Sequence, residues 1–307
     1  MTEENLAGRT IAGYRLRERV GEGGTATVYR AEHETHGRCA LKTLRANLRN
    51  DPTAVKRFLR EADYGTRVRH PGVVRTYAFG QEDGLHYLAL EWVDGEPLSK
   101  AAIRTGKFAP AIVATVVGEL ADALSATHVA GIIHRDLKPD NILYDADTHR
   151  VKLLDFGIAR DAQENASERL TRTGFFVGTL QYVAPEALSG ELVSERADIY
   201  SLATITYYLL TGYHPYQGRS PRELFSQLLS EDPVPLNQAG GKAFEFPKAL
   251  EEAVMKALSR DPNRRQVTVR TFADEVTQAI AQAPAVKAGS GVVGALARLF
   301  GCGTVDK

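Results

Sequence analysis

Apolar and polar residues alternate in short stretches of the N-terminal third, and this alternation predicts β-strands. In residues 38–44 it places Ala40 and Lys42 on one face of a strand, with apolar neighbours on the other face. Further strands are predicted at residues 14–30, around a glycine-rich turn, and at residues 85–91 and 151–154. The chain therefore begins with elements that suit a small sheet.

Helical spacing interrupts these strands once and then dominates the rest of the chain. Between Val55 and Ala62, apolar residues recur at positions i, i+3, i+4 and i+7. Asp51 is placed to cap this helix, and Pro52 suits its first turn. Three further helices are predicted at residues 109–130, 197–210 and 272–281.

Composition adds limits to this picture. The chain has 307 residues, of which 43% are hydrophobic and 25% charged, as in a soluble globular protein. Its 38 basic and 38 acidic residues give a net charge of zero, so we expect no nucleic-acid partner. Cys39 and Cys302 are the only cysteines, which favours no disulfide and a cytoplasmic location. We expect no signal peptide in residues 1–13 and no apolar run of the ~18 residues that a membrane span needs.

The most informative stretch is H-R-D-L-K-P-D-N at residues 134–141, followed by D-F-G at residues 155–157. Phosphoryl transfer needs one carboxylate to receive the attacking hydroxyl and separate oxygens to hold Mg²⁺ against the phosphates. Asp136 suits the first task. Asn141 and Asp155 suit the second, because Mg²⁺ prefers oxygen ligands.

These motifs resemble the catalytic loop and metal-binding turn of protein kinases. The resemblance covers about residues 14 to 280, with every motif in the expected order. The turn D-F-G-I-A-R and the segment G-T-L-Q-Y-V-A-P-E at residues 178–186 are most similar to bacterial-type, eukaryotic-like serine/threonine kinases. A lysine at position 138, two residues after Asp136, also favours Ser/Thr over Tyr as the acceptor.

The resemblance implies an α+β fold of two lobes. Residues 14–93 would form an N-lobe of antiparallel sheet plus one helix, and residues 94–280 a mainly helical C-lobe. Residues 1–13 would be an extension. Residues 281–307 would form a linker and a short amphipathic tail, which packs on the domain or docks to a partner or membrane surface.

The implied cofactors are ATP and Mg²⁺, with Mn²⁺ as an alternative. The glycine-rich turn departs from the family pattern because Ala26 replaces the third glycine, which we expect to stiffen the loop tip. An ordinary hairpin is the alternative for this turn taken alone. The residues implied to bind the nucleotide are Val20, Gly21, Glu22, Gly23, Gly24, Val28, Ala40, Lys42, Leu90, Glu91, Val93 and Leu143.

The resemblance also implies the catalytic roles. Lys42 would hold the α- and β-phosphates, oriented by an ion pair with Glu61. Asp136 would orient the substrate hydroxyl and take its proton, and Lys138 would neutralise the transferred phosphoryl group. Asp198 would brace the backbone of the catalytic loop.

Residues 158–183 resemble the regulatory loop of kinases that are activated by phosphorylation. Thr171 and Thr173 are the preferred phosphosites, ahead of Ser167, and Arg135 would pair with the phosphate. Thr179 would contact the catalytic aspartate and seat a Ser/Thr substrate. The glutamate of A-P-E, Glu186, would pair with Arg265.

Gly65 and Thr76 are less usual, because they fall where many kinases stack apolar side chains behind the active site. Small or polar groups there bury less surface. We hypothesise that the helix at residues 52–68 is held weakly in its active position and needs a partner or phosphorylation.

The sequence is thus predicted to encode a protein kinase that phosphorylates Ser/Thr hydroxyls of proteins and of itself, with a transient homodimer for autophosphorylation. The alternative is a pseudokinase-like nucleotide-binding scaffold, toward which Ala26, Gly65 and Thr76 point. Loss of a catalytic residue would mark such a scaffold, and all are present. Transfer to a small molecule is less expected, because the segment from Thr179 to Glu186 resembles a peptide-docking platform.

Overall fold

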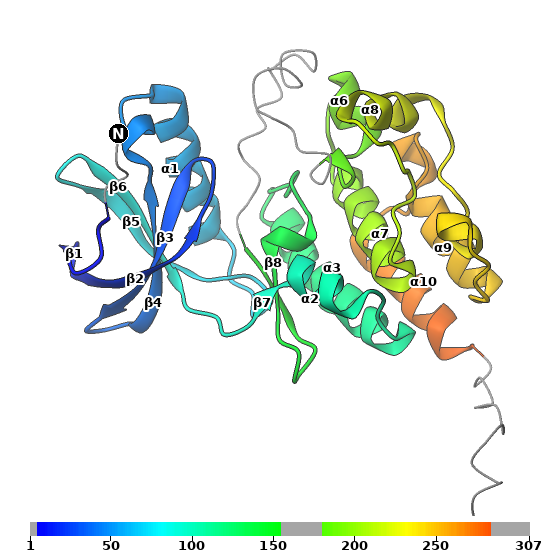
Figure 1. Cartoon of the computed structure of the whole chain (residues 1–307), viewed down its shortest axis with the longest axis horizontal. Coiled ribbons are helices and arrows are strands. Elements are labelled where there is room, and N and C mark those ends of the chain that lie inside the picture. The colour runs from blue at the N-terminus through cyan, green and yellow to red at the C-terminus, as the bar shows by residue number, and fades with distance from the viewer. Residues whose placement is uncertain (1–4, 155–179, 284–307) are drawn as a thin grey trace, which may run out of the picture.

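The computed structural model describes residues 5–154 and 180–283. Figure 1 shows an N-terminal lobe with a sheet and one long helix beside a C-terminal lobe built mainly of helices. The strands of the N-lobe are all antiparallel and pair in the order β1-β2-β3-β4-β6-β5. Their bounds are β1 Thr10–Ile11, β2 Tyr14–Glu22, β3 Ala26–His33, β4 Gly37–Leu44, β5 Thr76–Glu82 and β6 Leu85–Glu91. The predicted two-lobed α+β architecture is confirmed.

One face of this sheet carries an apolar cluster of its own. Tyr14, Leu16, Tyr29 and Leu41 are buried there, together with Leu6 from the chain before β1. The thiol of Cys39 belongs to the same cluster, and burial raises its pKa to about 11. A thiol with that pKa stays protonated and unreactive near neutral pH.

The other face of the sheet receives helix α1, Pro52–Arg67. The carboxylate of Asp51 accepts hydrogen bonds from the backbone N–H groups of Thr53 at 2.8 Å and Ala54 at 3.2 Å, so the predicted cap forms. Phe58 and Ala62 of the predicted stripe pack with residues of β3, β4 and β6. The helix that carries Glu61 is therefore fixed against the strand that carries Lys42.

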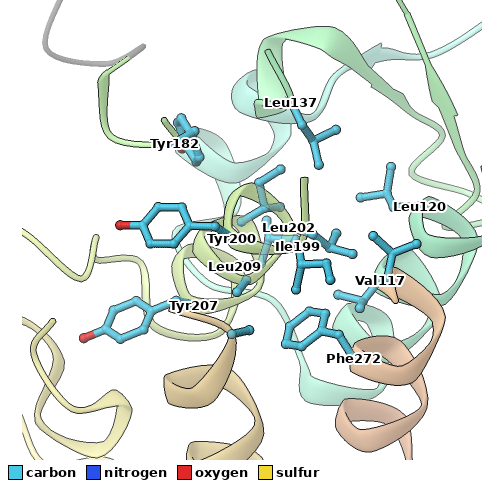
Figure 2. Close-up of a cluster of buried hydrophobic side chains, with 14 of the residues drawn as sticks. Val117, Leu120, Leu137, Tyr182, Ile199, Tyr200, Leu202, Tyr207, Leu209 and Phe272 are labelled. Atoms are coloured by element: carbon cyan, nitrogen blue, oxygen red, sulfur yellow. The ribbon is translucent and has the colours of Figure 1, made fainter. Parts of the chain in front are cut away.

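The C-lobe is organised around helix α7, in which most side chains are buried. Figure 2 shows Tyr200, Leu202 and Leu209 of α7 with Leu120 of α3 and Phe272 of α10. Truncating a buried leucine in such a core costs about 2–5 kcal/mol. The helices are α2 Leu98–Thr105, α3 Pro110–Val129, α6 Pro185–Ser189, α7 Arg196–Thr211, α8 Pro221–Ser230, α9 Lys248–Ala257 and α10 Val269–Ala281, with short 3-10 turns at Ala46–Leu48, Pro139–Asn141, Leu236–Gly241 and Pro262–Arg264.

A second, small sheet joins the two lobes. It consists of β7 Glu96–Pro97, β8 Ile142–Tyr144 and β9 Val151–Leu153, in that order. Leu153 donates its backbone N–H to the carbonyl of Gly72 at 2.8 Å, and Val74 donates to the carbonyl of Leu153 at 2.9 Å. The strand that precedes Asp155 is thereby bonded directly to the segment after α1.

Helix α3 bears on the expectation that no apolar run is long enough to span a membrane. In the part of the chain that the structure describes, it is the one helix long and apolar enough by composition to cross a membrane. Its Val113, Val117 and Leu120 are buried within the C-lobe core. The apolar composition of α3 is accounted for by its place beside α7 and α10.

Candidate active site

The predicted ion pair between Lys42 and Glu61 is present. Lys42 Nζ lies 2.6 Å from Glu61 Oε1, and the two side chains are only 9% and 17% exposed. Lys42 stands opposite Val28 of β3 and Leu88 of β6 in the sheet register, which directs its side chain to the α1 face. A lysine on the edge of a sheet, the ordinary alternative, is excluded because β4 lies between β3 and β6.

Gly65 and Thr76 meet behind this pair. A Cβ atom built on Gly65 would lie 2.3 Å from Oγ1 of Thr76. The two small residues therefore let α1 approach β5 very closely. Whether the helix needs a partner to stay there remains a hypothesis.

The catalytic loop gathers two of the predicted residues around the carboxylate of a third. Lys138 Nζ lies 3.0 Å from Asp136 Oδ2. The amide of Asn141 donates to the same oxygen at 3.1 Å and to the backbone carbonyl of Asp136 at 2.8 Å. The carboxylate is thus held in place by a cation and an amide, and it is 21% exposed.

Asp198 braces this loop from inside the C-lobe, as predicted. It is completely buried and accepts hydrogen bonds from the backbone N–H groups of His134 at 2.9 Å and Arg135 at 3.0 Å. Burial alone would raise the pKa of Asp198, but the hydrogen bond from His128 at 2.8 Å and the nearby His134 bring it below the usual value. The brace also holds Arg135 at φ +64°, a conformation that a non-glycine residue adopts only when its surroundings impose it.

The donors present fit a divalent cation. Because the NH₂ group of Asn141 bonds Asp136, its amide oxygen is the atom left to ligate a metal. Asp155 lies outside the described residues. Its neighbour Leu154 donates its backbone N–H to the carbonyl of Asn141 at 2.8 Å. Residues 5–154 and 180–283 contain no cluster of three His, Cys, Asp or Glu side chains that would form a separate metal site.

Several residues predicted to contact a nucleotide share one face of the N-lobe sheet. Ala40 is paired with Leu90, and Val28 with Lys42, and residues paired directly across antiparallel strands point to the same side. All of these except Lys42 are half-buried. Leu143 enters from β8 of the second sheet and is also half-buried.

The glycine-rich turn differs in one respect from expectation. Ala26 is not at the loop tip but is the first residue of β3, 3% exposed, and it packs with Leu44 and Leu88. Its methyl group therefore fills the N-lobe core rather than stiffening the tip. Val20, Gly21 and Glu22 end β2, Gly23 and Gly24 form the turn, and the backbone N–H of Gly23 bonds the carbonyl of Ala26 at 2.8 Å.

Hydrogen bonds and a cation–ring contact hold the connection between the lobes in place. The backbone N–H of Glu91 donates to the carbonyl of Arg75 at 2.8 Å. Because this N–H is already bonded, the backbone carbonyl of Glu91 is the group left for the predicted contact with the nucleotide. Its carboxylate bonds the side chain of Lys152, a contact the sequence did not suggest. Trp92 donates to Asp94 at 3.0 Å and lies under the guanidinium of Arg38, and Val93 beside it is half-buried.

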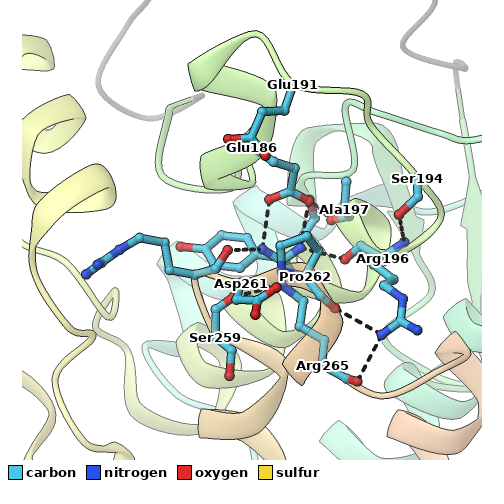
Figure 3. Close-up of polar contacts among 12 residues, drawn as sticks. Glu186, Glu191, Ser194, Arg196, Ala197, Ser259, Asp261, Pro262 and Arg265 are labelled. Carbon is cyan, nitrogen blue, oxygen red and sulfur yellow. Dashed lines mark hydrogen bonds and ion pairs between the residues drawn. The ribbon is translucent and has the colours of Figure 1, made fainter.

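The predicted pair between Glu186 and Arg265 is buried and bidentate. Nη1 and Nη2 of Arg265 lie 2.7 and 2.8 Å from the two carboxylate oxygens, and the side chains are 0% and 3% exposed. Figure 3 shows this pair with the backbone carbonyls that take the remaining donors. The contact fixes α6, which follows the predicted substrate-docking segment, against the chain between α9 and α10.

Five predicted site residues lie outside the described residues: Asp155, Ser167, Thr171, Thr173 and Thr179. Sequence reasoning also missed one residue of the site. His128 belongs to none of the motifs, yet it bonds Asp198. A polar residue on an otherwise apolar helix face was the available signal.

Comparison with known proteins agrees with this geometry. The model of the protein kinase domain family matches residues 14–278. The serine/threonine-protein kinase PknB of Mycolicibacterium smegmatis is 37% identical over 289 residues, which cover 92% of this chain and 45% of that protein. The serine/threonine-protein kinase pkn3 of Myxococcus xanthus is 36% identical over 281 residues, 89% of this chain and 51% of that protein. The chain therefore spans about half the length of these curated relatives.

A solved structure supports the fold. The crystal structure of a mutant of the Mycobacterium tuberculosis PknI kinase domain superposes with a TM-score of 0.68 at 27% identity, over 90% of this chain and 99% of that one. The family implies the use of ATP and a divalent metal ion. By its matched residues, its fold and its catalytic loop, this chain belongs to the protein kinase domain family.

Proposed function

We propose that the chain is a serine/threonine protein kinase that transfers the γ-phosphoryl group of ATP to hydroxyl groups of proteins. The observation that carries the proposal is the cluster of Asp136, Lys138 and Asn141 together with an intact pair of Lys42 and Glu61. The two serine/threonine kinases that match most of the chain support the choice of acceptor. A scaffold without catalysis would have no need to keep both arrangements.

The proposed role of each catalytic residue follows from its contacts. Lys42 is held by Glu61 at the α1 face of the sheet, where it would bind the α- and β-phosphates of ATP. Asp136 would accept a hydrogen bond from the substrate hydroxyl, orient it, and take its proton as the new bond to phosphorus forms. The bond between the γ-phosphorus and its bridging oxygen would break, with ADP as the leaving group. Lys138, 3.0 Å from Asp136, would stabilise the negative charge on the transferred group.

A divalent cation, proposed to be Mg²⁺ with Mn²⁺ as an alternative, would neutralise phosphate charge when bound. Asn141 and Asp155 would hold it. The role of this chain is to fix those ligands: the amide of Asn141 is oriented by Asp136, and the backbone next to Asp155 is bonded to Asn141. Positioning and charge stabilisation of this kind account for most of the rate enhancement in phosphoryl transfer.

Regulation by autophosphorylation is part of the proposal. Thr171 and Thr173 are the proposed sites, ahead of Ser167, and a second copy of this chain would be the substrate. Arg135 is the proposed phosphate ligand, because its backbone is locked by Asp198 directly beside Asp136. A phosphate paired with Arg135 would tie the regulatory segment to the catalytic loop.

Phosphosite mapping tests this proposal. The purified chain is incubated with ATP and Mg²⁺, and phosphorylated residues are located by mass spectrometry. We expect phosphate on Thr171 or Thr173 in the wild type and none in Asp136→Asn. Tight ATP binding without any phosphate, alone or with added Ser/Thr proteins, would overturn the kinase assignment in favour of the scaffold.

A further inference from the structure

A chain of three rings, one buried and two half-buried, starts within the proposed substrate-docking segment, outside the catalytic residues. The hydroxyl of Tyr182 lies 3.0 Å from Nε2 of His214. His214 in turn is stacked on Tyr208 of α7, with ring centroids 4.5 Å apart and an angle of 14° between the rings. Tyr182 meets His214 edge to face, at 5.4 Å and 76°. The imidazole is therefore held from two sides.

The protonation states of both groups suit this hydrogen bond. Burial lowers the pKa of His214 to about 4, so the ring is neutral near neutral pH and has one nitrogen that accepts. Burial raises the pKa of Tyr182, with Tyr208 and Asp140 adding to the effect, so its hydroxyl keeps the proton. The neutral imidazole and the protonated hydroxyl each offer one donor and one acceptor, so a hydrogen bond joins them at neutral pH.

The backbone of the same tyrosine is held from a third side. Ser201 of α7 donates its hydroxyl to the carbonyl of Tyr182 at 2.7 Å. Tyr182 is only 7% exposed and belongs to the same buried cluster as Tyr200 of α7 (Figure 2). Its side chain and its main chain are thus both fixed to the helix at the centre of the C-lobe.

The position of Tyr182 in the chain makes this anchor relevant to catalysis. It lies in the short stretch between residue 180 and α6, three residues after Thr179 and four before Glu186. The segment that carries Asp155, Thr171 and Thr173 rejoins the described C-lobe at this stretch. Any shift of Tyr182 would move the end of the segment against which a protein substrate is proposed to dock.

We infer that His214 is a positioning residue for protein substrates: it fixes Tyr182, and through it the docking segment, without touching the reacting atoms. The inference rests on the proposed kinase function. Removing the imidazole would leave a buried hydroxyl without a partner, which favours movement of the segment toward water. The nucleotide side of the site is formed by other elements, so its affinity should not change.

Two conservative variants test the role. His214→Phe keeps a ring on Tyr208 but removes the ring nitrogens, and Tyr182→Phe removes the hydroxyl. Each should raise KM for a protein substrate about five- to tenfold, which corresponds to the loss of one buried hydrogen bond, with KM for ATP unchanged. The double variant should be no worse than the poorer single variant, because both act through one contact.

Tyr144→Phe is the matched control. The hydroxyl of Tyr144 bonds Nδ1 of His149 at 2.6 Å and the rings are stacked, so the same chemistry is removed from a pair outside the docking segment. Its KM values should equal those of the wild type. Equal KM for protein substrate in wild type and His214→Phe, or additive effects in the double variant, would overturn the inference.

Amide hydrogen exchange separates this inference from the proposed function. Even if the wild type transfers no phosphate, which would refute the kinase proposal, the amides of residues 181–184 should exchange faster in His214→Phe than in wild type or Tyr144→Phe. Unchanged exchange in this stretch would refute the anchor itself, whatever the activity.

Discussion

The buried pair of Glu186 and Arg265 allows a sharp test of how the C-lobe is held together. Replacing Glu186 by glutamine keeps the shape of the side chain and removes its charge. Arg265 then keeps its bonds to the carbonyls of Ser259, Arg196 and Arg260, at 2.8, 2.9 and 3.2 Å, but loses its counter-ion. A guanidinium with no exposed surface cannot recover the loss from water.

The expected magnitude follows from burial. Breaking one side of a buried ion pair costs about 3–5 kcal/mol, because the remaining charge stays uncompensated. That is a large part of the about 5–15 kcal/mol that stabilises a typical folded protein. At roughly 2–4 °C per kcal/mol for a protein of this size, Tm should fall by about 6–20 °C.

Thermal unfolding followed by circular dichroism, at low and at high ionic strength, measures this change. The loss in Glu186→Gln should be the same at both, since buried pairs are screened little by salt. Glu252→Gln is the matched control, because Glu252 pairs with Lys248 at 3.1 Å on the surface of α9, with side chains 63% and 89% exposed. It should leave Tm unchanged. A Tm for Glu186→Gln equal to that of the control would refute the reasoning.

Three further predictions concern the site. Glu61→Gln should lower kcat/KM for ATP by about tenfold or more, because Lys42 loses the charge that orients it. Steady-state kinetics measures this change, and an unchanged kcat/KM would mean that the pair does not serve ATP binding or transfer. Gly65→Ala should weaken ATP binding, measured by calorimetry, since its Cβ would lie 2.3 Å from Thr76 Oγ1. Adding Thr76→Ala should restore binding. Failure of this rescue would mean that the close approach does not position α1. The pKa of Asp198 is lower in the folded than in the unfolded chain, so its contribution to stability is present above about pH 4 and is lost as pH falls through the folded pKa. Asp198→Asn should therefore be less stable than wild type at neutral pH but lose less stability on acidification, and parallel unfolding curves against pH would contradict this.

The parts of the site that were predictable are those in which local pattern and motif spacing agree. The alternation around Lys42 predicted which residues share its face of the strand. The apolar stripe after Asp51 predicted which face of α1 is buried. Because the face of each element was defined, the pairing of Lys42 with Glu61 could be predicted. Asp198 was likewise predictable, because a carboxylate within an apolar helix must find hydrogen-bond donors in the interior.

The parts that were not predictable depend on contacts between distant residues with no local signal. Nothing near His214 shows that its partner is Tyr182, 32 residues earlier. The side chain of Ala26 was misplaced because a glycine-rich turn leaves the first residue of the next strand undefined until the sheet register is known. The contact of Lys152 with Glu91 joins two strands of different sheets, which the sequence order does not bring together.

The most direct test of the central claim compares wild type with Asp136→Asn in two assays, ATP binding by calorimetry and γ-phosphate transfer to a Ser/Thr-containing protein. The account predicts equal ATP affinity in both and loss of transfer by about a thousandfold or more in the variant, because a positioned carboxylate is removed while the nucleotide contacts remain. Equal transfer rates in the two proteins, or no transfer by a wild type that binds ATP, would contradict it.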